Sequence, residues 1–180
     1  MEIAGPNVYD VYIIRTPVGW KWFPKAVRDA LVQRVKEGAG LILVQPFSGA
    51  DDFDASDLWS IAALTDCKSD RMEEPSGYMR EPTEGLVVGR PWKVAGPDHP
   101  ITRGLPIDLL PFAAMSHQQY KAAADATVLI QADNGDPVVA VRQAGKGRVV
   151  SLAYRAFDMA PEIVQRAGGA PPVDSNSWGG

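Results

Sequence analysis

Residues 8–44 read VYDVYIIRTPVGWKWFPKAVRDALVQRVKEGAGLILV. The segment 8–16 combines β-branched and aromatic residues, which predicts a strand. The segment 24–38 begins with a proline and ends at a glycine, and its apolar residues recur at three- and four-residue spacing, as in a helix. The segment 40–44 is almost wholly apolar, as in a strand covered on both faces. Strand, helix and strand in this order predict a right-handed βαβ unit with two parallel strands.

The rest of the chain extends this pattern. A second helix is predicted over residues 56–64 and an irregular stretch over 66–85, followed by a set of apolar runs typical of strands: residues 86–88, 92–94, 112–115, 128–132, 138–142 and 148–153. Asn134-Gly135 and the glycines at 145–147 supply turns between the last three runs. We therefore predict an α/β, flavodoxin-like, three-layer domain whose sheet is mainly parallel, with an antiparallel hairpin region near the C-terminus.

Size and charge limit the classes of function. The 180 residues suit one domain, predicted over residues 1–167 with a flexible tail over 168–180. The net charge of −4 argues against a nucleic acid or an anionic membrane as partner. No apolar run long enough to span a membrane and no signal peptide is visible, and the compartment stays open. Cys67 is the single cysteine, which excludes an intrachain disulfide and a zinc site built from cysteines.

Four ordered motifs carry a resemblance to a known family. They are YDVYII at 9–14, VKEGAGLILV at 35–44, HPITRGLP at 99–106 and GKGRVV at 145–150. In this order they resemble the class I glutamine amidotransferase-like superfamily. More narrowly, they resemble its branch of trehalose-utilisation (ThuA-like) proteins and amidotransferase-like domains of bacterial β-galactosidases. The resemblance covers most of residues 8–155 and implies the same α/β fold.

Two departures from that family matter. The family's sheet usually begins with a strand and a helix ahead of the segment that resembles 8–14. Either this chain is a domain of a longer protein, which we expect, or the missing elements come from elsewhere. The family also places a catalytic cysteine on a sharp turn after the strand that matches 41–44, and a His-x-Glu pair after the strand that matches 148–153. Here those positions read Gln45-Pro46-Phe47 and Tyr154-Arg155-Ala156. An active glutamine amidotransferase is therefore not expected, and no catalytic residue is assigned.

Polar residues nevertheless follow several of the predicted strands. If these strands are parallel, their carboxyl ends meet at one rim, where ligands of α/β proteins bind. The candidates for ligand binding at this rim are Arg15, Thr16, Gln45, Phe47, Ser48, His117, Gln118, Tyr154 and Arg155. A rim of ordinary polar loops is the alternative, and for His117 a structural, hydrogen-bonded role is the alternative.

Other motifs have simpler interpretations. Ser48 lacks the glycines of a Gly-x-Ser-x-Gly elbow, and Cys67 lies away from that turn. His99 precedes a proline and is expected to organise a turn. The acidic cluster of residues 51–57 carries ligand types for Ca²⁺ or Mg²⁺, but helix capping explains it equally well, and no metal is assigned. The aromatic cluster at 20–23 suits stacking on a sugar or, more usually, a core contact.

We therefore expect a non-catalytic amidotransferase-like module of a larger, carbohydrate-related bacterial protein. Its expected partners are other domains of that protein, a second copy or a sugar-like ligand, and no cofactor is expected. The alternative is a ThuA-like enzyme that acts on a sugar derivative through His117, Arg15 and Tyr154. A third possibility is a pure assembly module, because loss of the family's first strand would leave an unpaired sheet edge and exposed apolar surface.

Overall fold

The computed structural model describes residues 9–15, 19–49, 52–67, 85–87, 90–107 and 117–154. The predicted strand over residues 112–115 and the predicted tail over 168–180 lie outside these ranges, as does most of the predicted irregular stretch over 66–85.

The predicted βαβ unit is confirmed. Strand β1 (Val11–Arg15) is followed by a 3-10 turn, η1 (Trp20–Trp22), helix α1 (Lys25–Glu37) and strand β2 (Gly40–Val44). The two strands pair in parallel, with Val11 opposite Gly40 and Arg15 opposite Val44. Gly38 ends α1 at a φ of 139°, a backbone conformation that glycine adopts without a steric penalty.

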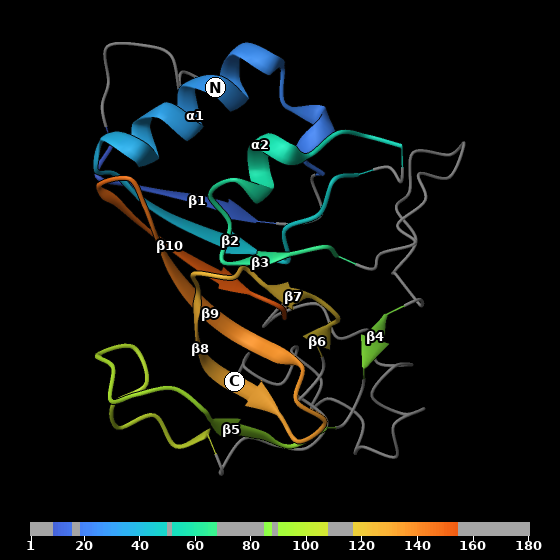
Figure 1. Cartoon of the computed structure of the whole chain (residues 1–180), viewed down its shortest axis with the longest axis vertical. Coiled ribbons are helices and arrows are strands. Elements are labelled where there is room, and N and C mark those ends of the chain that lie inside the picture. The colour runs from blue at the N-terminus through green and yellow to red at the C-terminus, as the bar shows by residue number, and fades with distance from the viewer. Residues whose placement is uncertain are drawn as a thin grey trace, which may run out of the picture.

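Six strands form the main sheet, in the order β1-β2-β10-β9-β8-β5 (Figure 1). The four strands that complete it are β5 (Trp92–Val94), β8 (Thr127–Ala132), β9 (Pro137–Ala144) and β10 (Gly147–Leu152). Strand β10 pairs with β2 in parallel, whereas the pairs β10-β9, β9-β8 and β8-β5 are antiparallel. Four strands, β1, β2, β10 and β8, therefore run in the same direction. The α/β sheet and its antiparallel hairpin region near the C-terminus are confirmed.

The predicted second helix is shorter than expected. Helix α2 covers only Ser56–Trp59, because Leu64–Thr65 forms strand β3 and pairs with β7 (Lys121–Ala122). The Nη1 atom of Arg142 in β9 donates hydrogen bonds to the carbonyl oxygens of Trp59 and Ala62, both at 3.1 Å. These carbonyl oxygens therefore have a donor although the helix does not continue. A further two-stranded pair joins β4 (Leu86–Val87) to β6 (His117–Gln118).

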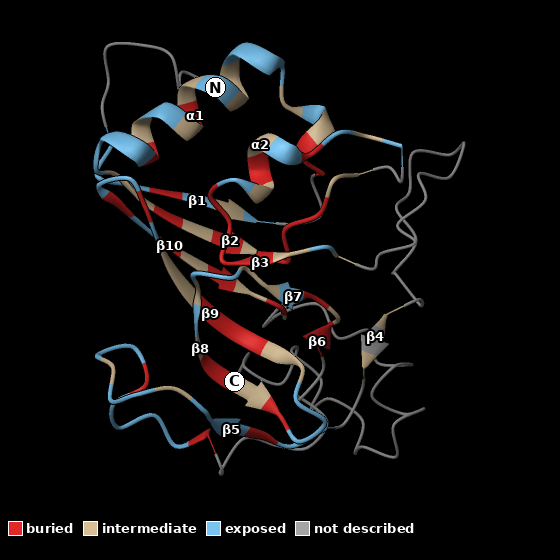
Figure 2. Cartoon of the chain, in the orientation of Figure 1, coloured by how far each residue is buried: buried red, intermediate tan, exposed pale blue. Residues whose placement is uncertain are grey.

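Both α-helices cover the same face of the sheet (Figure 1). Leu31 of α1 and Leu58 of α2 pack there against a buried row from neighbouring strands: Tyr12, Leu41, Leu43 and Val149. The opposite face is buried mainly at β8 and β9, around Ile130 and Val139 (Figure 2). Among the residues that the structure describes, no α-helix lies on that second face. None of the described helices is long and apolar enough to cross a membrane.

Candidate functional site

Gln45 occupies the turn directly after β2, where the resemblance places a nucleophile. Its φ is +48°, a left-handed conformation that residues other than glycine adopt only at an energetic cost. The side chain is 5% exposed. The backbone N–H donates to the carbonyl oxygen of Leu152 at 2.7 Å, and the amide Nε2 lies 3.4 Å from the carbonyl oxygen of Ala153. The turn therefore has the positive φ expected of an elbow, but its side chain is a buried amide hydrogen-bonded to the end of β10.

Gln118 reaches the same end of β10 from strand β6. Its backbone N–H donates to the Ala153 carbonyl oxygen at 2.8 Å, and its side chain is buried. The Ala153 N–H in turn donates to Val138 at 2.8 Å. Gln45 and Gln118, which are 73 residues apart, thus share one carbonyl oxygen at the carboxyl end of the sheet.

His117 precedes Gln118 and is fully buried. Its Nε2 atom lies 3.1 Å from Oδ2 of Asp136, which also accepts hydrogen bonds from Asn134 at 2.8 Å and Gln119 at 3.4 Å. The imidazole contacts the edge of Trp92 at a centroid distance of 6.3 Å, and Trp92 lies 4.9 Å from the ring of Tyr154. Sequence reasoning missed Asp136 and Trp92. The Asn134-Gly135 pair predicted a turn beside Asp136, but nothing in the sequence indicated that Asp136 would bind His117.

Burial and hydrogen bonding act in opposite directions on this group of residues. Burial lowers the pKa of His117, and the hydrogen bond and negative charge of Asp136 offset that effect only in part. Burial by itself would raise the pKa of Asp136, but hydrogen bonds from Asn134, His117 and Gln119 lower it overall. Burial also raises the pKa of Tyr154. Burial thus favours the neutral form of His117, and hydrogen bonding favours the ionised form of Asp136.

The lowered pKa of His117 predicts a loss of stability in mild acid. The unfolded chain binds a proton at this histidine near pH 6.5, whereas the folded chain resists it until lower pH. The stabilising contribution is therefore complete above pH 6.5 and is lost as the pH falls from 6.5 through the folded pKa. Denaturant titrations between pH 7.5 and pH 5, run in parallel on His117→Gln and on His99→Gln, measure it. The free energy of unfolding should depend less steeply on pH in His117→Gln than in the native chain, and His99→Gln should keep the native dependence. An equal change in His99→Gln would mean that His117 is not the source of the pH dependence.

The hollow beside Gln45 is small. It is bounded by side chains of β1, β2 and η1, including Ile14, Leu43 and Trp20, and its volume is about 10 Å³. Such a volume holds one water molecule at most. Phe47 is buried, and the carbonyl oxygens of Phe47 and Ser48 accept hydrogen bonds from the backbone of η1. This hollow is therefore too small for a sugar-sized molecule.

The predicted rim residues fall into three groups. Gln45, His117, Gln118 and Tyr154 gather around the end of β10. Phe47 and Ser48 belong to the loop that pairs with η1. Arg15 is exposed at the end of the outermost strand, where it pairs in register with Val44. Thr16 and Arg155 lie outside the described residues.

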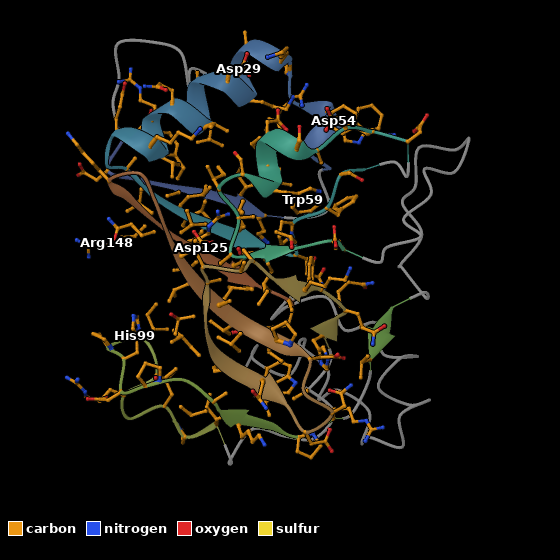
Figure 3. The ribbon with its side chains drawn as sticks, in the orientation of Figure 1. Asp29, Asp54, Trp59, His99, Asp125 and Arg148 are labelled. Atoms are coloured by element: carbon orange, nitrogen blue, oxygen red, sulfur yellow. The ribbon has the colours of Figure 1, made fainter. Side chains whose placement is uncertain are left out.

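The acidic cluster and the aromatic cluster prove to contact each other. Asp57 Oδ1 accepts from the indole N–H of Trp20, and its Oδ2 accepts from Arg28, both at 2.7 Å. Asp54, at the start of α2 (Figure 3), accepts from the Ser56 N–H, which lowers the pKa of this carboxyl. Trp20 is 2% exposed, a core position rather than a stacking platform. Asp57 thus serves the packing of α1, α2 and η1, and Asp54 serves the start of α2.

Two further residues have local roles. His99 accepts a hydrogen bond at Nδ1 from the Ile101 N–H at 3.2 Å, so it organises a turn as predicted. That turn follows β5, on the side of the molecule away from α1 (Figure 3). Cys67 follows β3 and packs against the small cluster around Tyr120.

Comparison with known proteins extends the fold assignment only. No protein-family model and no curated protein sequence matches this chain. Among solved structures, it is similar to the cytoplasmic protein STM1381 of Salmonella typhimurium LT2, at 17% identity and a TM-score of 0.57 over 87% of this chain and 66% of that protein. It is also similar to the cytoplasmic protein STM3548 of Salmonella typhimurium, at 16% identity and a TM-score of 0.57 over 88% and 67%.

A third similar structure is a thua-like protein from Parabacteroides merdae ATCC 43184, at 16% identity and a TM-score of 0.52 over 86% of this chain and 62% of that one. At such low identity the likeness concerns the fold. The chain spans about two thirds of the length of these three proteins.

Proposed function

We propose that this chain is a non-catalytic α/β module that works by contact with other domains, with a second copy or with a small ligand. The observation that carries the proposal is Gln45. It holds the strained position after β2 where the resembled family exposes a nucleophile, yet it is 5% exposed and hydrogen-bonded to β10. An amide is neither a nucleophile nor a base, and burial removes it from any substrate.

The surroundings of Gln45 support the same proposal. The adjacent hollow, of about 10 Å³, is too small for a sugar, and His117 is fully buried against Asp136. A strained backbone persists where the surrounding structure determines it, and here the bonds to Leu152 and Ala153 do so. The turn at Gln45 thus connects β2 to the end of β10, where Gln118 of β6 also binds.

The link to carbohydrate metabolism rests on the family resemblance. The motifs at 9–14 and 35–44 resemble ThuA-like proteins, and one structural neighbour is described as thua-like. On this basis we place the module in a larger carbohydrate-related protein, with a sugar-like molecule as the ligand class if it binds one.

The proposal predicts that the purified chain releases no ammonia from glutamine. The only thiol, Cys67, packs against the cluster around Tyr120 rather than on the turn after β2. A coupled ammonia assay on the chain and on Cys67→Ser should give the same background rate. Release that scales with protein concentration would contradict the proposal, and its loss in Cys67→Ser would identify the nucleophile.

One observation favours the alternative, a ThuA-like enzyme. His117, Asp136, Tyr154 and Trp92 form a connected group at the carboxyl end of the sheet. Against it, Arg15 lies two strands away from Leu152 in the sheet register and is exposed on the outermost strand. Turnover of sugar derivatives that falls in His117→Gln but not in His99→Gln would favour this enzyme over the module.

A further inference from the structure

Strand β1 forms one edge of the described sheet, and its outer side is unpaired there. The Asp10 carbonyl oxygen accepts a hydrogen bond from the Gly40 N–H, so it faces β2. Because the backbone groups of successive residues face opposite sides of a strand, those of Val11, Ile13 and Arg15 face away from β2. No described residue pairs with them. Such a row of free donors and acceptors is a template for another strand.

The side chains beside this edge are apolar and exposed. Val11 is 52% exposed and Ile13 is 65% exposed, both on the face opposite the helices. Ile13 continues inward in register as a row of apolar residues across the neighbouring strands: Ile42, Val150 and Val141. Exposed apolar surface that continues into a core marks an interaction site.

The opposite edge of the same sheet is protected. Strand β5 has three residues, carries the exposed Lys93, and directly follows Pro91. Short length, a charged side chain and a proline are devices by which proteins keep an edge strand from pairing. Strand β1 is longer and contains no proline, and its one charged residue, Arg15, lies at its end. Strand β1 is therefore less protected against pairing with another strand than β5 is.

We infer that β1 is the surface through which two copies of this chain associate, by antiparallel pairing of their β1 strands. Antiparallel pairing suits the charges, since β1 follows Asp10 and ends on Arg15. It brings the acidic start of each strand to the same end of the pair as the basic end of the other, whereas in-register parallel pairing would place like charges directly opposite each other. If Val11 lies opposite Ile13 of the second copy, each copy covers both exposed apolar side chains of the other. The two-fold symmetry makes this contact occur twice.

The inference rests on the proposed function, because it names one partner and one surface for the module's contact role. The two ideas fail separately. A catalytic turnover would overturn the proposed function and leave the association untouched. A monomer at all concentrations would overturn the association and leave a non-catalytic module that contacts other domains or ligands.

Light scattering coupled to gel filtration tests the association directly. The mass should rise from 19.4 kDa toward twice that value as the concentration is raised about a hundredfold, because a small strand-strand interface dissociates on dilution. Ile13→Lys should remain at the monomer mass, since a lysine on a sheet edge opposes pairing. Val94→Lys, at a 47% exposed apolar position on the protected edge β5, is the matched control and should still dimerise.

Hydrogen exchange provides a second readout that does not depend on a variant. The amides of Val11, Ile13 and Arg15 should exchange more slowly as the concentration of the native chain is raised, while those of β5 stay unchanged. A mass that remains at 19.4 kDa throughout, or dimerisation that survives Ile13→Lys but not Val94→Lys, overturns the assignment.

Discussion

Replacing Gly147 with alanine is expected to destabilise this protein by about 3 kcal/mol or more, at the upper end of the range for overpacking. Gly147 opens β10 and lies against the C-terminal end of α1. A Cβ atom at this position would overlap the carbonyl oxygen of Val35 and would come within 2.5 Å of that of Ala39. Both obstacles are backbone atoms, and Ala39 lies between α1 and β2, so relief of the clash would separate the helix from the sheet.

The matched control is Gly135→Ala, in the turn between β8 and β9. Gly135, unlike Gly147, has a positive φ, of 90°, but a Cβ atom there meets nothing within 4 Å. This variant should cost only about 1–2 kcal/mol, from backbone strain. Urea titrations of both variants compare the two costs. Equal losses would mean that the contact between the 145–147 turn and α1 is looser than the structure has it.

The part of the fold that the sequence predicted is the part with local signals. The helix ending at Gly38 and the apolar run 40–44 are periodic patterns within a few residues, and both elements form where expected. Helix α2 was predicted too long because 61–64 reads as apolar in either conformation. Its end is decided by Arg142, about eighty residues downstream, which binds the carbonyl oxygens of Trp59 and Ala62. No local pattern reports such a contact.

The candidate site shows the same division. The turn at Gln45 was located from its place after a buried strand, and its positive φ fits an elbow. The partner of His117 was missed, since Asp136 lies 19 residues away across a turn and two strands. Arg15 was grouped with the rim because it follows a strand. The strand order, which the sequence does not encode locally, puts it instead at the outer edge of the sheet.

Removal of the Asp57 carboxylate is the other change expected to have a large effect. Asp57→Ala should lower the free energy of unfolding by about 2–3 kcal/mol, because it leaves buried donors without an acceptor. The Trp20 side chain is 2% exposed and that of Arg28 is 13% exposed, so water reaches them poorly. The indole N–H and the guanidinium would both lose a 2.7 Å bond, and η1, α1 and α2 would lose the group that joins them.

Two variants separate this effect from the loss of any surface charge. Asp29→Ala removes the 2.6 Å ion pair with Lys25 on the outer face of α1, where both side chains are at least half exposed, and should cost less than about 0.5 kcal/mol. Asp57→Asn keeps an acceptor for one donor and should lie between Asp57→Ala and the native chain. Tryptophan fluorescence, to which Trp20 contributes together with the four other tryptophans, can follow the same titrations. If Asp57→Ala loses no more than Asp29→Ala, then packing of Leu31 and Leu58 holds the two helices together, and the carboxylate merely fills a gap between them.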